Sequence, residues 1–168
     1  MARASAIAEH LDRLLRTKDV PDYPGAINGL QLASAGEIER VVTAVDFSTA
    51  TVLQAVRARA GLLIVHHGMF WGAPQPFRGP SYERLVALIE NDIAVYSSHL
   101  PLDLHPEIGN NVLLARELGL QPAAGFAPSS SFISPTTASG LSDTGTLSFL
   151  SFQMLRLHAG EQLGQRPR

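Results

Sequence analysis

Three short apolar runs alternate with two amphipathic segments in the N-terminal part of the chain, and this alternation constrains the fold more than any other feature. The runs lie at 40–45, 62–65 and 93–97, and their apolar, β-branched character is typical of buried strands. A helix is predicted after each of the first two runs, and Ser48 is a candidate N-cap for the first helix. Strands joined by such helices are parallel, and the connections are right-handed. The sequence therefore predicts an α/β fold with a mostly parallel sheet and flanking helices.

Two further helices are expected on either side of this unit. Residues 4–16 carry apolar side chains at helical spacing, and residues 110–118 form a shorter helix that Gly119 ends. A chain of 168 residues is long enough for one domain with a real core. We therefore assign residues 1–126 to one α/β domain.

The composition changes after residue 126. Of the 20 residues at 127–146, 14 are Ser, Thr, Pro or Gly, which leaves too few apolar groups to offset the entropy of ordering. We expect this stretch to be loop or disorder, and residues 127–168 to form a divergent C-terminal segment. Residues 147–157 are apolar at a period that fits a last helix or a strand.

Composition excludes several classes of partner and site. The formal charge is −2, with 13 basic and 15 acidic residues, so no nucleic acid partner is expected. No run approaches the ~18 apolar residues of a membrane span, and Glu9 and Asp12 interrupt the N-terminal segment, so we expect a cytoplasmic protein without membrane contact. The chain has no cysteine, so any metal must be held by imidazole and oxygen ligands.

Polar side chains follow each predicted strand. Asp46 follows the first strand, His66 and His67 follow the second, and His99 and Asp103 follow the third. In open parallel sheets, ligands bind beyond the carboxyl ends of the strands. We therefore expect these side chains to meet at one edge of the sheet.

The adjacent histidines are the most informative pair. Burying two imidazoles is costly unless each ring nitrogen finds a partner, and a divalent ion satisfies one nitrogen on each ring. A regular strand would point His66 and His67 to opposite faces, so we expect them to converge, or to serve one ion each, only where the strand ends, with Gly68 supplying backbone freedom. Two hydrogen-bonded histidines at a strand exit are the alternative. Phe70 and Trp71 are predicted to be core or pocket wall.

The segment from His99 to Pro106 adds a carboxylate. Asp103 lies at a predicted turn between Pro101 and Pro106, where a stiff backbone can aim a side chain; an Asx-type cap is the alternative. His99 is open to three interpretations, a metal ligand, a partner that orients a ligand or the substrate, and a surface histidine. We favour the second for His99.

Four motifs together resemble a known family. They are NGLQ at 28–31, AVDFST at 44–49, HHGMFW at 66–71 and HLPLDLHPEIGNN at 99–111. In this order and at these separations they are similar to the Nif-three-like family, the GTP cyclohydrolase I type 2 homologues. The resemblance covers residues 1 to about 126. It implies an α/β fold, a dinuclear metal site, and a homo-oligomer that is a ring-shaped hexamer built from dimers.

Carried over motif by motif, the resemblance implies His66, His67 and Asp103 as metal ligands, with Asp103 bridging two ions. Family members complete the site with a His and a Glu, four residues apart, in a C-terminal Gly-His motif. This motif is absent here. His158 and Glu161 are three residues apart, and we do not expect them to be ligands. We expect a truncated or frame-disrupted member with an incomplete site, which translation of the coding DNA in all three frames would test.

These observations predict a metal-dependent hydrolase-like protein in which one or two divalent ions per subunit, Zn, Mn, Fe or Ni, activate a water molecule. His99 is then a candidate proton donor or substrate contact. The small-molecule substrate is not identified, and GTP follows from the resemblance alone. A non-catalytic metal-binding or regulatory interaction protein is the competing prediction. A structural α/β domain with hydrogen-bonded histidines is the third.

Overall fold

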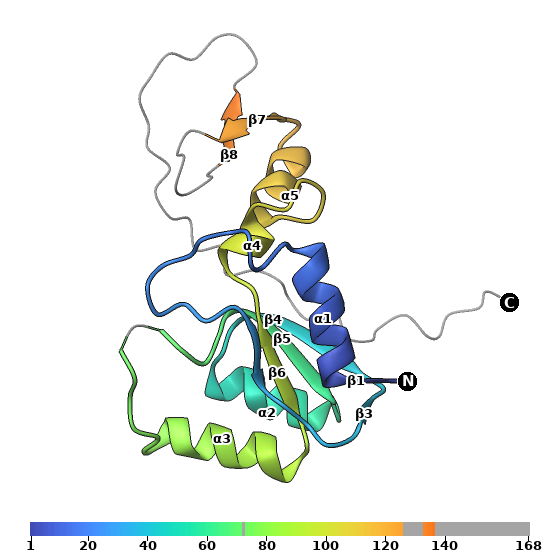
Figure 1. Ribbon diagram of the computed structural model, residues 1–168, viewed down its shortest axis with the longest axis vertical. Helices are drawn as coiled ribbons and strands as arrows, with labels where there is room; N and C mark the ends of the chain where they lie inside the picture. The colour runs from blue at the N-terminus through green and yellow to red at the C-terminus, as the bar shows by residue number, and fades with distance from the viewer. Residues whose placement is uncertain (72, 126–132, 137–168) are drawn as a thin grey trace, which may run out of the picture.

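The computed structural model describes residues 1–71, 73–125 and 133–136 (Figure 1). At its centre is a four-stranded sheet with the order β2-β6-β5-β4. Strands β4, β5 and β6 are parallel, and β2 pairs antiparallel with β6 at one edge. The predicted α/β class with a mostly parallel sheet is confirmed. The strands of this sheet are β2 (Gly29–Leu32), β4 (Val41–Asp46), β5 (Leu62–His67) and β6 (Ala94–Ser97).

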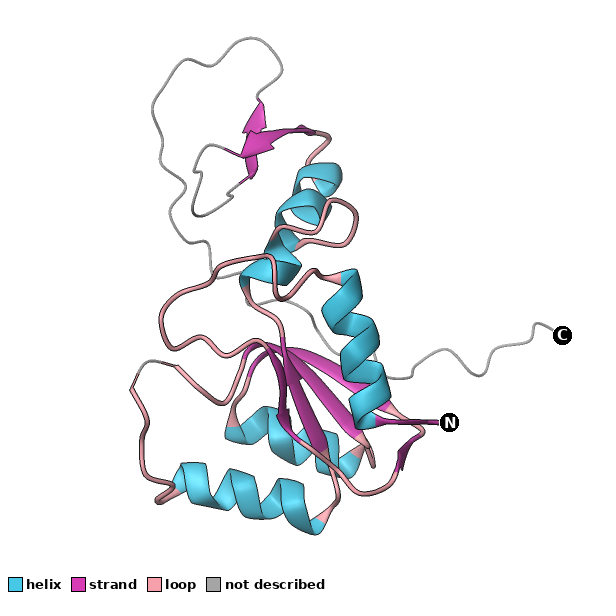
Figure 2. Cartoon of the chain, in the orientation of Figure 1, coloured by secondary structure: helices cyan, strands magenta, loops and turns pink. Residues whose placement is uncertain are grey.

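Helices cover both faces of the sheet. Figure 2 shows α1 on one face and α2 and α3 together on the other. Two short helices, α4 and α5, follow β6 and extend away from the sheet beyond its carboxyl ends (Figure 1). The helices are α1 (Ala4–Leu14), α2 (Thr49–Arg57), α3 (Pro80–Glu90), α4 (Leu100–Asp103) and α5 (Asn110–Glu117). Among the described helices, none combines the length and the hydrophobicity of a transmembrane span.

Strand alternation divides the core into two layers. Leu63 and Val65 of β5 belong to the cluster that contains the buried side chains of α2 and α3. Leu62 of the same strand and Tyr96 of β6 belong to the cluster that contains Ala4 and Ala8 of α1. Each large apolar side chain buried in this way contributes about 1.5–3 kcal/mol relative to an exposed one. Burial on both faces explains why these strands are continuous apolar runs in the sequence.

Most predicted boundaries agree with the structure. The helices expected at 4–16 and 110–118 are α1 and α5, and Gly119 follows α5 with a φ of +68°. Ser48 caps α2, where its Oγ accepts a hydrogen bond from the Thr51 backbone N–H at 3.1 Å. Strand β2 was not predicted from the sequence. It has four residues, too few to show a period, and its pairing with β6 is a tertiary contact.

Four further strands complete the described chain. They form two pairs, β1 (Ala2–Arg3) with β3 (Glu37–Ile38) and β7 (Gln121–Gly125) with β8 (Ile133–Thr136). The prediction of loop or disorder was wrong for the residues of β8, because backbone pairing with β7 is not visible in composition. The candidate helix at 147–157 lies outside the described residues, as do His158 and Glu161. The boundary at residue 126 stays a prediction.

Candidate metal centre

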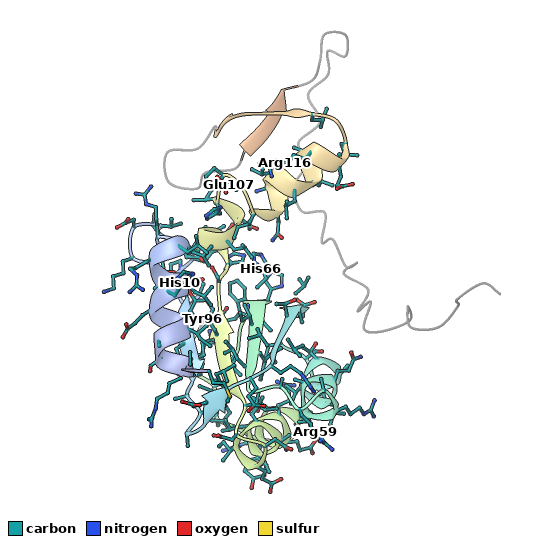
Figure 3. The ribbon with its side chains drawn as sticks, turned by 90° about the vertical axis from the view of Figure 1, so that its right-hand side faces the viewer. His10, Arg59, His66, Tyr96, Glu107 and Arg116 are labelled. Atoms are coloured by element: carbon teal, nitrogen blue, oxygen red, sulfur yellow. The ribbon has the colours of Figure 1, made fainter. Side chains whose placement is uncertain are left out.

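The carboxyl ends of the parallel strands bring three histidines together. His66 and His67 end β5, and His99 follows β6. The ring centroids of His66 and His67 are 4.7 Å apart, as are those of His66 and His99. One ring nitrogen from each of the three histidines lies within 4.8 Å of the others. Figure 3 shows His66 at the end of the sheet that faces α4 and α5. These three residues form a group able to hold a metal ion.

The two adjacent histidines converge at the end of β5, where convergence was expected, but both lie within the strand. Strand β5 continues through His67, so both residues belong to the strand rather than to the loop after it. A different neighbour holds each ring. His66 Nδ1 lies 3.0 Å from the Ser98 carbonyl oxygen, and His67 Nδ1 lies 2.6 Å from Asp46 Oδ1. Both contacts occupy Nδ1 with an acceptor, which assigns the proton to Nδ1 and leaves Nε2 free to bind a metal.

Gly68 is required for space and not for backbone freedom. Its φ is not positive. A Cβ at this position would lie 2.6 Å from Ser97 Oγ and would also clash with the Gln31 side chain. The Gln31 amide cannot easily move away, because its Oε1 accepts from the Met69 backbone N–H and its Nε2 donates to the Ile27 carbonyl, both at 2.6 Å. The role predicted for Gly68 is therefore corrected.

His99 is held by a buried network that sequence reasoning missed. The Asp22 side chain is 5% exposed, and its Oδ1 accepts from His99 Nδ1 at 2.8 Å. Its Oδ2 accepts from Asn28 Nδ2 at 2.8 Å and from the Leu100 backbone N–H at 3.0 Å. Asn28 Oδ1 in turn accepts the backbone N–H of His99 at 2.7 Å. The one signal in the sequence was Asn28 in the NGLQ motif, because Asp22 lies in a connector rich in Pro and Gly.

The Asp22 carboxylate remains charged despite its burial. Burial raises the pKa of Asp22. Hydrogen bonds from Asn28, His99 and the backbone N–H groups of Tyr23 and Leu100 together lower it by more, so the pKa lies below its ordinary value. A charged Asp22 keeps the His99 proton on Nδ1. As with His66 and His67, Nε2 of His99 is then free to act as a ligand or as a base.

Asp103 reaches the same place from α4. The prediction of a turn free of helical constraint was wrong, because Asp103 is the last residue of α4, which begins Leu100-Pro101. Proline favours the first turn of a helix, where its missing N–H costs nothing. Asp103 Oδ1 accepts from Asn110 Nδ2 at 2.8 Å, and Oδ2 lies 3.6 Å from His66 Nε2. One carboxylate oxygen is thus anchored while the other faces the imidazoles.

Burial keeps His66 in the form that binds metals. Its side chain is 12% exposed. Burial lowers the pKa of His66, the Asp103 carboxylate opposes this shift, and the neighbouring His99 and His67 rings lower the pKa further, so that it lies below its ordinary value. His66 is therefore neutral near pH 7, and neutral imidazole is the metal-binding form.

The donor set fits a divalent transition metal. The three imidazole nitrogens form the group whose ligand atoms lie together; Asp103 is outside that group, with Oδ2 3.6 Å from His66 Nε2. Zn, Mn, Fe and Ni all accept imidazole and carboxylate ligands. His99, predicted as a proton donor or substrate contact, lies inside the group of imidazoles. Geometry therefore makes His99 a candidate ligand as well as a candidate catalytic residue.

An open cavity of about 470 Å³ lies beside the imidazoles. Trp71, predicted as core or pocket wall, is a wall residue whose side chain is 44% exposed. Phe70 does not line this cavity. The lining residues are Tyr23, Asp46, Phe47, His67, Gly68, Trp71 and His99.

Comparison with known proteins agrees with this fold. The family model described as Duf34/NIF3 (NGG1p interacting factor 3) matches residues 2–166. The chain belongs to the Duf34/NIF3 family. The resemblance seen in the four sequence motifs is thereby confirmed.

The relatives of this Duf34/NIF3 chain are longer than it is. The GTP cyclohydrolase 1 type 2 homolog of Deinococcus radiodurans is 44% identical over 110 residues, which are 66% of this chain and 41% of the relative. The homolog of Pseudomonas aeruginosa is 42% identical over 125 residues, 74% of this chain and 49% of the relative. The crystal structure of TTHA1606 from Thermus thermophilus superposes with a TM-score of 0.69 at 41% identity, covering 74% of this chain and 51% of that one. The chain spans about half or less of the length of these relatives.

Proposed function

We propose that this Duf34/NIF3 chain is a metal-dependent hydrolase-like protein in which His66, His67 and Asp103 hold one or two divalent ions. The observation that carries the proposal is the shared arrangement of the imidazoles. In each ring Nδ1 is occupied by an acceptor, and the ligand atoms of the three histidines lie within 4.8 Å of one another. A bound divalent ion would polarise a substrate group and lower the pKa of water.

His99 is proposed as the proton-transfer residue. The buried Asp22 carboxylate holds the His99 ring through Nδ1, so proton exchange is confined to Nε2. An imidazole held in this way by a carboxylate is a suitable general acid or base. His99 as a third imidazole ligand is the alternative. Metal content of His99→Gln distinguishes the two roles, since only a ligand lowers stoichiometry when it is replaced.

Elemental analysis of the purified full chain tests the metal site. We expect one or two Zn, Mn, Fe or Ni ions per chain, and loss of stoichiometric metal in His66→Ala and in Asp103→Ala. His10→Ala is the matched control, because His10 is an exposed histidine of α1. Full metal content in either site variant would refute the assignment of ligands.

The competing proposal is a non-catalytic metal-binding or regulatory protein. A site that holds metal through three ligands, without a second carboxylate-histidine pair, would favour it. Turnover of phosphodiester, nucleotide and amide substrates with added manganese or zinc separates the two. Turnover that is lost in His66→Ala supports the enzyme, and metal binding without turnover supports the competitor.

GTP as a substrate comes from the names of the relatives. We include it among the nucleotide substrates for that reason alone. We also propose a homo-oligomer, with a hexamer as the expected form, and a cytoplasmic location.

A further inference from the structure

The cavity beside the imidazoles has walls made mostly of rings. Tyr23, Phe47 and Trp71 line it together with His67 and His99. The Trp71 ring stands edge-on to the His99 ring, with centroids 4.9 Å apart and an interplanar angle of 83°. The Tyr23 ring lies 5.8 Å from the same imidazole. Two aromatic side chains from separate segments, one before β2 and one after β5, therefore stand beside one candidate metal-site residue.

These two aromatic rings are left partly uncovered. Tyr23 is 45% exposed and Trp71 is 44% exposed, whereas Tyr96 in the core is fully buried. A single exposed aromatic residue is ordinary. Two that line the same cavity form an apolar surface, and such surfaces at concave sites mark ligand binding. Stacking against a flat ring would cover both.

The charges at the cavity do not suit a phosphate. None of its described lining residues is Lys or Arg. The Asp46 side chain, 54% exposed, places a carboxylate there instead. The Arg84 guanidinium lies 5.3 Å from the centre of the Phe47 ring, but Arg84 is not a lining residue. Phosphate recognition relies on cationic or backbone N–H donors aimed at its oxygens.

We propose that this cavity binds the uncharged planar ring, aromatic or heteroaromatic, of a small molecule whose polar substituent meets His67 and His99. The proposal names a substrate class for the proposed metal site and rests on that proposed function. The volume of about 470 Å³ lies within the ~300–1,000 Å³ of small-molecule pockets. Aromatic rings gain from stacked or edge-to-face contact beyond simple burial. The described lining residues offer no Lys or Arg to phosphates attached to such a ring.

Intrinsic fluorescence tests this directly, because Trp71 is the single tryptophan of the chain. The metal-loaded full chain is titrated with benzamide and with cyclohexanecarboxamide, which share the carboxamide but differ in ring planarity. We expect benzamide to bind at least about five-fold more tightly, in keeping with two aromatic contacts. Equal affinity for the two probes, or no saturable binding of either, would overturn the proposal.

A second pair of probes tests the charge argument. Guanosine and GTP carry the same planar base and differ in their phosphates. On the metal-free chain, where no bound ion attracts the phosphates, we expect GTP to bind no more tightly than guanosine. Binding of GTP about ten-fold or more tightly than guanosine would show a phosphate site, and would contradict the proposed ring-only recognition. Binding of guanosine and GTP is measured by calorimetry, because both molecules absorb ultraviolet light and would interfere with tryptophan fluorescence.

Variants locate the ring site. Tyr23→Leu and Trp71→Leu should each reduce the preference for benzamide, while Tyr23→Phe retains it. Phe77→Leu is the matched control, because Phe77 is 45% exposed and does not line the cavity. Calorimetry replaces fluorescence for the Trp71 variant. A preference that survives both leucine variants, or that is lost equally in Phe77→Leu, contradicts the placement.

Metal content measured on the same samples separates this proposal from the proposed function. Metal-loaded protein without a preference for the planar ring contradicts the ring site alone. A clear preference in protein that holds no metal contradicts the metal site alone.

Discussion

Asp22 provides four of the polar contacts that organise the residues around His99. It accepts from the His99 ring, from Asn28 and from two backbone N–H groups. It donates none, so every contact depends on a charged acceptor in a place that is almost fully buried. In Asp22→Asn, the side-chain NH2 group would face hydrogen-bond donors that now face a carboxylate oxygen. Replacing one carboxylate oxygen of Asp22 by an amide nitrogen is therefore expected to affect both the stability of the fold and the position of His99.

We predict that Asp22→Asn lowers the free energy of unfolding by about 1–3 kcal/mol, the usual cost of leaving a buried hydrogen-bonding group unpaired. Urea unfolding measures this. Asp19→Asn is the matched control, because Asp19 is 60% exposed and its side chain pairs, among the described residues, with the exposed Arg16, a kind of pair that contributes little. Equal effects at the two positions would show that the Asp22 network adds no stability.

The stability difference between the native chain and Asp22→Asn should depend on pH with a defined sign. The pKa of Asp22 lies below its ordinary value of 3.8, so the charged form stabilises the folded state. That stability is fully present above the ordinary value and is lost as pH falls toward the lowered value. The difference between the native chain and Asp22→Asn should therefore be constant near pH 6 and shrink below about pH 4. A difference that grows on acidification would contradict the assignment.

At the scale of elements, α2 follows the end of β4 that contributes to the cavity. It begins at Thr49, after its N-cap Ser48 and the two cavity residues Asp46 and Phe47. Its start is marked by Ser48, which satisfies a backbone N–H that has no partner within the helix. This local signal needs no tertiary contact, which is why the start of α2 was predicted from the sequence.

We predict that Ser48→Ala lowers stability by about 1 kcal/mol, the typical value of an N-cap. Ser48→Asn should restore most of this, because asparagine caps helices as well as serine does. Thermal and urea unfolding give the measurement. If the alanine and asparagine variants lose the same amount, the Ser48 hydroxyl acts through something other than the cap.

At the scale of the whole molecule, the site depends on three strand ends and α4 at once. His66 and Asp103 are brought to 3.6 Å only when the sheet and α4 are both in place. A metal that binds this arrangement and not the unfolded chain stabilises the fold by mass action. Metal binding and folding are therefore expected to be coupled.

We predict that a chelator lowers the melting temperature of the native chain. Free metal at 100 times the dissociation constant contributes ~2.7 kcal/mol, which corresponds to a shift of several degrees. Calorimetric scans with and without chelator measure it. His66→Ala should melt at one temperature under both conditions, and His10→Ala should behave like the native chain. An equal shift in His66→Ala would place the stabilising metal elsewhere.

The sequence by itself determined the parallel unit from β4 to β6 and the residue types at its carboxyl ends. Apolar runs, helical spacing and caps are local, so they can be read without knowing what packs against them. The pair His66-His67 and the carboxylate of Asp103 belong to this local information.

Only the tertiary structure decided which groups hold these side chains. Asp22 lies 77 residues from His99, and the four residues of β2 pair with a strand that comes much later in the chain. Such partners show no period and no spacing, because their contacts depend on how the layers pack. The same packing, and not a flexible backbone, makes glycine necessary at position 68.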